Sequence, residues 1–319
     1  MLLWVTVLIG CFTLKWFLGR LKVKNYAEKY VLVTGCDTGF GNLLAKRLDR
    51  LGFQVIAACL KQDAAAELKK TSSERLQTLQ LDVTSEDNIK SALTKVKSIL
   101  PSNKGLWAVV NNAGVGGAIG PIECLNRKDY MDSLAVNLFG VIDVTKMFLP
   151  LIRKEKGRVV NIASMLGRIA LTPAPAPYCV AKYGVEAFSD CLRREVYHQG
   201  IKVSILEPGY FNTEIINTQQ VHKRFQEAFN QGDSDFQHYY GQEFIDQTKM
   251  LINKLPETSS NKLFKVIDAY EHAITARYPK PRYIVGKDAK YFVRLLWTIP
   301  EWMSDFVICL NSPRPQGSR

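Results

Sequence analysis

Six short apolar segments, separated by stretches long enough for a helix, limit most strongly how this chain can fold. They begin at residue 30 and are YVLVTG, FQVIAACL, LQTLQLDVT, LWAVVNNAG, GRVVNIAS and IKVSILEPG. Each is aliphatic or β-branched almost throughout, as expected of strands that are buried on both faces of a parallel sheet. The pattern therefore predicts an α/β fold, a doubly wound parallel sheet covered by helices on both faces.

The segment 1–19 is apolar apart from Lys15 and differs in kind from the rest of the chain. A membrane span needs about 20 apolar residues, and no small-residue cleavage site is evident, so this segment predicts an uncleaved membrane anchor. Arg20, Lys22 and Lys24 follow it directly. Basic residues beside an anchor favour the cytosolic side for the domain behind it, although three charges do not fix the side.

Behind the anchor, residues 29–286 form the predicted sheet-and-helix domain. Within it, residues from about 212–280 are polar and helix-prone, which predicts a helical insertion on the substrate side, and 282–286 (RYIVG) can add an edge strand. The last segment, 287–319, has an apolar stretch over 291–310 and an end with the composition of a disordered tail. Charged residues interrupt that stretch, so it fits a substrate-pocket helix, a membrane-surface helix or a pair of core helices.

Charge and cysteine content exclude other classes of function. The net charge is +12, and the basic residues are spread along the chain rather than clustered with aromatic ones. An anionic membrane surface or a polyanionic cofactor fits this charge, and we expect no nucleic-acid partner. The seven cysteines include no C-x-x-C pair and no neighbouring histidine set. This pattern predicts reduced thiols and no metal site.

The first predicted strand runs into a glycine-rich turn, VTGCDTGFG. Gly35 permits a tight turn, Gly39 lets the backbone approach a pyrophosphate, and Gly41 allows the following helix to pack closely on the sheet. The N-terminus of that helix offers unpaired N–H groups and the positive end of its dipole to an anion. Because the turn follows the first strand of an α/β pattern, it predicts a dinucleotide site in a Rossmann-type fold.

Local charge decides between NAD and NADP, which differ by one phosphate. Asp37 lies inside the glycine turn, where a 2′-phosphate would favour a basic residue. The end of the second predicted strand, AACLKQ, supplies neither an acidic ribose ligand nor an arginine, only Lys61. The sequence therefore favours NAD over NADP, with Lys61 as the residue that a 2′-phosphate would contact.

Tyr178 and Lys182 are four residues apart in YCVAK, at the start of a predicted helix. Positions i and i+4 share a helix face, so both side chains can enter one cleft. A phenol has a reference pKa of about 10, and a neighbouring ammonium favours its ionised form. Ser164 ends the fifth predicted strand, at the edge where such sheets bind ligands. Together the three residues predict acid–base chemistry at a substrate oxygen.

These motifs resemble the short-chain dehydrogenase/reductase family, and within it the microsomal branch of retinol dehydrogenases and 3α/17β-hydroxysteroid dehydrogenases. The resemblance rests on TGCDTGFG, LDVT, NNAG, VNLFG, YCVAK, EAFSDCLRRE and EPGYFNT, and it covers roughly 30–310. It implies an enzyme of the endoplasmic reticulum membrane that acts on a lipophilic substrate, with a homodimer as one option for its assembly.

The resemblance also implies roles for individual residues. Ser164 would orient the substrate oxygen, and Tyr178 would take or give the proton. Lys182 would hold the nicotinamide ribose and share a proton relay with a water held by Asn137. The cofactor set that the resemblance implies runs from the adenine end to the nicotinamide and comprises Gly35, Asp37, Gly39, Phe40, Gly41, Asp82, Asn111, Ala113, Gly114, Tyr178, Lys182, Pro208, Gly209 and Thr213.

One segment departs from the family pattern. TPAPAP, at 172–177, replaces the glycine-rich stretch that usually precedes the tyrosine. Prolines stiffen this segment and remove backbone donors. The leading hypothesis is NAD-dependent oxidation of a lipophilic alcohol, a retinol or a hydroxysteroid. The alternatives are NADP(H)-dependent reduction of a retinal or a ketosteroid, and a catalytically silent cofactor-binding scaffold whose cleft this loop blocks.

Overall fold

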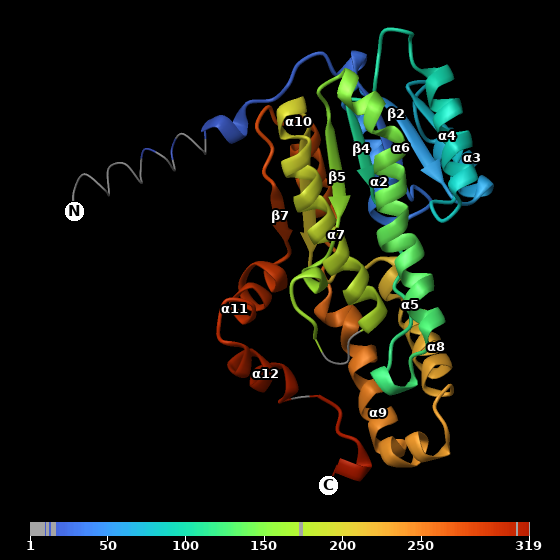
Figure 1. The fold of residues 1–319 in the computed structure, drawn as a ribbon, viewed down its shortest axis with the longest axis vertical. Coiled ribbons are helices and arrows are strands. Elements are labelled where there is room, and N and C mark those ends of the chain that lie inside the picture. The colour runs from blue at the N-terminus through green and yellow to red at the C-terminus, as the bar shows by residue number, and fades with distance from the viewer. Residues whose placement is uncertain (1–9, 11–12, 14–16, 172–174, 311, 319) are drawn as a thin grey trace.

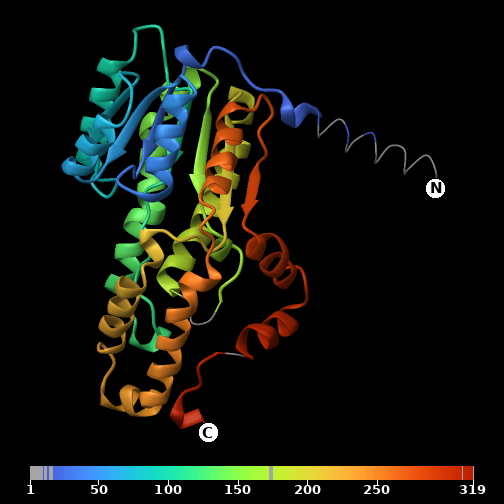
Figure 2. The ribbon, with the colours of Figure 1, turned by 180° about the vertical axis from the view of Figure 1, so that it is seen from behind.

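The computed structural model describes residues 10, 13, 17–171, 175–310 and 312–318. Figures 1 and 2 show the chain from two opposite sides. The predicted anchor over 1–19 lies for the most part outside the described residues, and so do 172–174 of the proline-rich segment.

A seven-stranded parallel sheet forms the centre of the fold, in the order β3-β2-β1-β4-β5-β6-β7 (Figure 1). The first six strands lie in the six apolar segments, and the seventh confirms the predicted edge strand. The order reverses between β1 and β4, which opens a crevice at the carboxyl ends of the strands. The strands are β1 (Tyr30–Thr34), β2 (Gln54–Cys59), β3 (Leu76–Gln80), β4 (Ala108–Asn111), β5 (Arg158–Ile162), β6 (Lys202–Pro208) and β7 (Arg282–Val285).

Helices cover both faces of the sheet and extend beyond its carboxyl edge (Figures 1 and 2). The covering helices are α2 (Gly39–Arg50), α3 (Gln62–Lys70) and α10 (Phe264–Thr275) on one face, and α4 (Glu86–Ile99), α6 (Gly140–Lys154) and α7 (Ala176–Glu195) on the other. The others are α5 (Arg127–Leu134), α8 (Thr218–Phe229), α9 (Ser234–Thr258), α11 (Arg294–Leu296) and α12 (Glu301–Cys309).

The side chains of β1 explain why the inner strands are largely apolar, whereas the edge strand β3 alternates buried Leu76 and Leu79 with exposed Gln77 and Gln80. Val31 and Val33 lie in the core between the sheet and α2, whereas Leu32 lies in the core on the opposite face. All three are fully buried. Alternate residues of a strand point to opposite faces, so a strand covered on both sides needs an apolar residue at every position.

One helical stretch of the described chain, Arg127–Lys154, is long and apolar enough to cross a membrane by length and composition. In the fold it comprises α5, a π-helical turn (Ala135–Phe139) and α6. Val144 and Phe148 of α6 are fully buried in the core on the sheet. The apolar character of this stretch is therefore explained by its contact with the sheet.

The predicted insertion, about 212–280, divides into two parts. Helices α8 and α9 extend beyond the sheet and enclose a small core that includes Phe225 and Phe236 (Figure 1). By contrast, α10 returns to the sheet and buries Tyr270 in the main core. The insertion thus ends before α10, because the apolar face of that helix belongs to the layer that covers the sheet.

The two ends of the α8–α9 insertion are joined by backbone hydrogen bonds. The N–H of Asn212 donates to the carbonyl of Ser260 at 3.1 Å, and the N–H of Ser260 donates to the carbonyl of Tyr210 at 2.9 Å. A short parallel bridge pairs Phe211 with Ser260 between them. The chain therefore leaves the sheet domain and re-enters it at one place.

The end of the chain differs from the predicted disordered tail. Within 312–318, the N–H of Arg314 donates to Oε1 of Gln247 on α9 at 3.3 Å. Gly317 lies over the ring of Tyr239, with a Cβ at that position only 2.3 Å from the ring. The described tail is thus held against α9 by a hydrogen bond and a close ring contact that its composition does not reveal.

The buried face of α6 gives a testable expectation for stability. Replacing Phe148 with Ala should lower the free energy of unfolding by about 3–5 kcal/mol, because it leaves a cavity against the sheet. Phe264→Ala is the matched control, since Phe264 begins α10 and is 52% exposed. Denaturant unfolding of the detergent-solubilised protein would measure both, and equal losses would contradict this packing.

Candidate active site

A cavity of about 620 Å³ lies at the carboxyl edge of the sheet. Its walls come from the turn after β1, the loop after β4, the segments after β5 and β6, and helices α7 to α9. Most of the residues predicted from the sequence line it: Gly35, Asp37, Gly39, Phe40, Asp82, Ala113, Gly114, Ser164, Tyr178, Lys182, Pro208, Gly209 and Thr213. Gly41, Asn111 and Asn137 lie behind the walls.

The glycine turn is held in a shape that side chains would prevent. Gly35 has a φ of +67°, and a Cβ there would lie 2.6 Å from Cα of Ala113. A Cβ on Gly41 would lie 2.2 Å from the carbonyl oxygen of Gly35. The first helical turn can therefore press against the strand end, which leaves backbone rather than side chains facing the cavity.

Asn112 fixes this turn, and sequence analysis did not assign it a role. Its Nδ2 donates to the carbonyls of Thr34 and Gly35, both at 3.0 Å. Its Oδ1 accepts a hydrogen bond from the hydroxyl of Tyr270 at 3.1 Å. Its position as the second asparagine of NNAG could have indicated this role, because Asn112 directly follows β4 and β4 pairs with the strand that leads into the glycine turn.

Asn111, predicted among the cofactor residues, lies inside the sheet instead and is 2% exposed. Its Nδ2 donates to Oγ1 of Thr145 and Oδ1 of Asn161, both at 2.8 Å. Side chains alternate along β4, so Asn111 points into the helix layer and Asn112 toward the glycine turn. Asn111 thus supports the sheet beside the site and does not line the cavity, so its place in the cofactor set is corrected.

Two carboxylates lie at the end of the cavity formed by β2 and β3. Asp37 accepts hydrogen bonds from the N–H groups of Leu60 and Lys61 at 3.0 and 2.8 Å. Asp82 accepts from the N–H and the hydroxyl of Thr84 at 2.9 and 2.7 Å. Asp37 therefore places a fixed negative charge at the end of β2, and Asp82 is held in a turn after β3.

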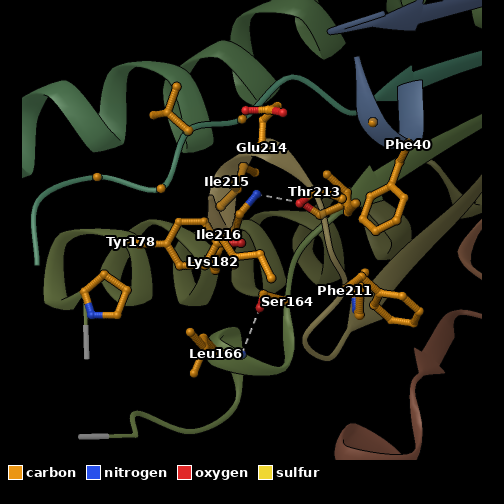
Figure 3. A pocket seen from close by; sticks show the side chains of 18 of the residues that line it. Phe40, Ser164, Leu166, Tyr178, Lys182, Phe211, Thr213, Glu214, Ile215 and Ile216 are labelled. Carbon is orange, nitrogen blue, oxygen red and sulfur yellow. Dashed lines mark hydrogen bonds between the residues drawn. The ribbon is translucent and has the colours of Figure 1, made fainter. Parts of the chain in front are cut away.

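Ser164, Tyr178 and Lys182 come together at the other end of the cavity (Figure 3). The Nζ of Lys182 lies 5.4 Å from the centre of the Tyr178 ring and donates to the carbonyl of Ile162 at 3.0 Å. Ser164 accepts a hydrogen bond from the N–H of Leu166 at 3.1 Å and also hydrogen-bonds Tyr178. Pro177 lies in the first turn of α7, where a missing N–H is tolerated, so the helix can start directly ahead of the tyrosine.

Burial shifts the acid–base groups in opposite directions. It raises the pKa of Tyr178 to about 12, although the hydrogen bond with Ser164 acts to lower it. It lowers the pKa of Lys182 to about 8. Loss of water disfavours the charged form of both groups. The phenol is thus held as an acid, and additional positive charge in the cavity would favour the phenolate.

Asn137 is brought next to this group by the π-helical turn between α5 and α6. Its Oδ1 accepts from the N–H of Val115 at 3.1 Å, and its Nδ2 donates to the carbonyl of Val115 at 2.9 Å. A Cβ on Gly114 would lie 2.9 Å from Oδ1 of Asn137 and 3.8 Å from Nζ of Lys182. Asn137 and Lys182 therefore flank one backbone position, and the relay water remains a prediction.

A buried cluster of ionisable residues supports α7 beside Tyr178 and Lys182. Arg282 of β7 contacts Glu186, one turn after Lys182, and Glu207 of β6, both at 3.0 Å. Burial raises the pKa of both carboxyls, that of Glu186 to about 8. The cluster ties α7 to the strands that carry the end of the cavity.

The remaining wall of the cavity is largely apolar; sequence analysis predicted a substrate-side insertion there but named none of the residues of this wall. Its residues come from the segments after β4, β5 and β6 and from α8 and α9; they include Ile119, Leu166, Leu171, Ile215, Ile216, Val221, Leu251, Ile252 and Leu255. Arg224 joins two parts of this wall, because its guanidinium donates to the carbonyls of Gly117 and Ile215 at 3.2 and 2.6 Å. Its donors are thus directed to the backbone.

Comparisons with known proteins find relatives along almost the whole chain. Residues 29–224 match the short chain dehydrogenase family. Retinol dehydrogenase 7 of Rattus norvegicus is 44% identical over 316 residues, and 17-beta-hydroxysteroid dehydrogenase type 6 of Homo sapiens is 42% identical over 316 residues. Each match covers 99% of this chain and 99% of the relative.

Two solved structures share the fold. A short-chain dehydrogenase from Streptomyces avermitilis has a TM-score of 0.69 at 24% identity, over 88% of this chain and 96% of that chain. A short chain dehydrogenase/reductase from Burkholderia phymatum in complex with NAD has a TM-score of 0.70 at 19% identity, over 92% of this chain and 98% of that chain.

The hydrogen bonds of Asn112 give a testable expectation for the glycine turn. Asn112→Ala should cost about 1–3 kcal/mol of stability, because two backbone carbonyls lose their donor, and it should weaken dinucleotide binding. Tyr270→Phe removes only the bond to Oδ1 and is the matched control. Thermal unfolding and NAD titration would measure both variants, and unchanged NAD affinity in Asn112→Ala would contradict the role assigned to this residue.

Proposed function

The chain belongs to the short-chain dehydrogenase family of oxidoreductases, and on that premise we propose that it oxidises a lipophilic alcohol, a retinol or a hydroxysteroid, by hydride transfer to NAD. One observation carries the proposal: Ser164, Tyr178 and Lys182 face a cavity whose other wall is largely apolar. The names of the two relatives, a retinol dehydrogenase and a 17-beta-hydroxysteroid dehydrogenase, support the substrate class.

The residues around the glycine turn fit a dinucleotide. Thr38, which precedes α2, makes no side-chain capping bond, so the first N–H groups of the helix are available to an anion. A Cβ on Gly39 would meet only one atom within 4 Å, a methyl carbon of Thr213, so the turn opens onto free space. The bound cofactor would supply the hydride acceptor, held by this turn at one end and by Lys182 and Thr213 at the other.

In the proposed reaction, Tyr178 acts as the phenolate and accepts the proton of the substrate hydroxyl on its oxygen, while Ser164 hydrogen-bonds the substrate oxygen. General-base assistance of this kind contributes about 10²–10⁴-fold to a rate. Lys182 stabilises the phenolate, because its ammonium lies near the ring and little water screens the pair. The apolar wall holds the substrate and keeps water from the reacting oxygen.

The proposal includes location and assembly. We infer that the apolar segment 1–19 anchors the protein in the endoplasmic reticulum membrane, with the folded domain on the cytosolic side. Protease treatment of intact microsomes would degrade a cytosolic domain and spare a lumenal one. A homodimer stays a prediction that sedimentation in detergent would test.

Tyr178→Phe should reduce turnover by about 10²–10⁴-fold, because it removes the proton acceptor, while NAD binding remains. The matched control is Tyr183→Phe, which lies on the same helix and is 45% exposed. The assay is NADH formation by detergent-solubilised protein with all-trans-retinol and, separately, with a 3α-hydroxysteroid. Unchanged turnover in Tyr178→Phe would rule out this mechanism. Cofactor binding by the wild-type protein without turnover of either alcohol would favour the silent scaffold.

A change at Asp37 tests whether the protein prefers NAD or NADP. Its carboxylate, fixed at the end of β2, would repel a 2′-phosphate placed there. Asp37→Asn should therefore lower the ratio of kcat/KM for NAD to that for NADP several-fold, mainly through a lower KM for NADP. If the wild-type protein already prefers NADP, and Lys61→Asp removes that preference, the NADP(H)-dependent reductase is the better description.

A further inference from the structure

The segment from Lys287 to Leu310 presents an apolar face to solvent. Six of its exposed large side chains are Tyr291, Phe292, Leu295, Trp302, Phe306 and Leu310. Tyr291 and Trp302 are each 73% exposed. A soluble monomer rarely exposes so many large apolar residues within one short segment, so this face requires an occupant.

Helix α12 shows that this face points away from the protein. Ser304 is buried and Ile308 packs on the domain, so these two residues, one turn apart, face inward. Trp302, Phe306 and Leu310 follow the same four-residue spacing on the opposite side of the helix. The helix is therefore amphipathic, with its apolar stripe directed outward.

The inner side of the segment forms the support of the active-site wall. Val293 and Leu296 pack in one cluster with Met165 and Leu166, and the latter two line the cavity. The guanidinium of Arg168 lies 5.2 Å from the centre of the Trp297 ring. The segment is thus fixed to the substrate end of the cavity, and whatever covers its outer face lies near that end.

The side chains of the outer face indicate which occupant fits. Tryptophan and tyrosine are enriched where a bilayer meets water, because their rings are apolar and carry one polar group. Lys287, Lys290 and Arg294 are exposed at the start of the segment, where they can meet lipid phosphates. The exposed acids Glu301 and Asp305 lie on the flank of α12, outside its apolar stripe.

The start of the described chain lies on the same side of the molecule. Figures 1 and 2 both show the described residues 17–20 and α11–α12 on the side of the domain where β7 lies. The carbonyl of Gly19 is held at 2.8 Å by Nε2 of His272 on α10, so this exit point is fixed. The residues before it are apolar in sequence, and a membrane that held them would adjoin this side.

From these observations we propose that the outer face of 287–310 docks onto a lipid bilayer, with the stripe of α12 among the acyl chains and Lys287, Lys290 and Arg294 at the phosphates. This is a membrane contact separate from the N-terminal segment. It stands whether or not the proposed reaction is correct. For a lipophilic substrate, it would bring the apolar end of the cavity close to the bilayer in which the substrate dissolves.

Quenching of Trp302 by brominated lipids tests the proposal in the full-length chain. Trp4 and Trp16 are first replaced by Phe, and the protein is reconstituted in phosphatidylcholine vesicles with or without bromine on the acyl chains. The emission of Trp302 is the difference between this protein and its W302F variant. We expect brominated chains to remove most of that difference, whereas emission of the buried Trp107 is retained. Emission from Trp302 that bromination leaves unchanged would overturn the proposal.

Phe306→Glu provides the matched variant, because it places a charge in the stripe without touching the inner face. It should restore Trp302 emission in brominated vesicles, with the unfolding temperature unchanged. Phosphatidylserine in the vesicles should deepen quenching, and replacing Lys287, Lys290 and Arg294 with Gln should remove that increase. If Trp302 stays unquenched and Phe306→Glu dissociates a dimer in detergent, a second copy covers the face and the proposal is wrong.

Discussion

The contact between β1 and β4 is the constraint on which the site depends. Thr34 ends β1, and its hydroxyl donates to the carbonyl of Val110 at 3.4 Å and accepts from the N–H groups of Asn112 and Ala113 at 3.0 and 3.1 Å. Asn112 in turn holds the carbonyl of Gly35. These bonds fix the two loops that leave the sheet in opposite directions, so the crevice between them keeps its shape without a ligand.

Tyr178 and Lys182, the proposed catalytic residues, lie in surroundings of low polarity that this architecture creates. A buried lysine has no shell of water to stabilise its charge, and Lys182, 2% exposed, donates to only a backbone carbonyl among the described contacts. A buried phenol likewise resists ionisation. The same burial strengthens any interaction between the two groups, because the local dielectric is low. Burial therefore disfavours the charged forms of Lys182 and Tyr178, and a charge that enters the cavity would shift the ionisation of both groups.

The sheet could be predicted from the sequence, and so could the residues that line the cavity from the glycine turn to Tyr178. The inner residues of β1, Val31 to Val33, are apolar, and Gly35 and Tyr178 belong to motifs with fixed spacing, so the local sequence indicates both the strand and these lining residues of the cavity. The substrate wall could not be predicted in the same way. Ile215, ahead of α8, and Leu251, on α9, line one cavity only after the insertion folds, and no period or spacing links them in the chain. The position of α10 on the sheet could not be predicted either, because its apolar face resembles that of any amphipathic helix and does not indicate which surface it covers.

The two ends of the α8–α9 insertion lie side by side where they join the sheet domain, because Tyr210 and Asn212 form backbone hydrogen bonds with Ser260. Two residues between these points belong to the rest of the site: Thr213 faces the cavity beside Gly39, and Arg224 hydrogen-bonds the carbonyl of Gly117. The remainder of α8 and α9 packs on its own aromatic core and supplies only part of the apolar wall. A change of sequence in these two helices can therefore alter what the cavity accepts while Thr213, Arg224 and the strands keep their neighbours.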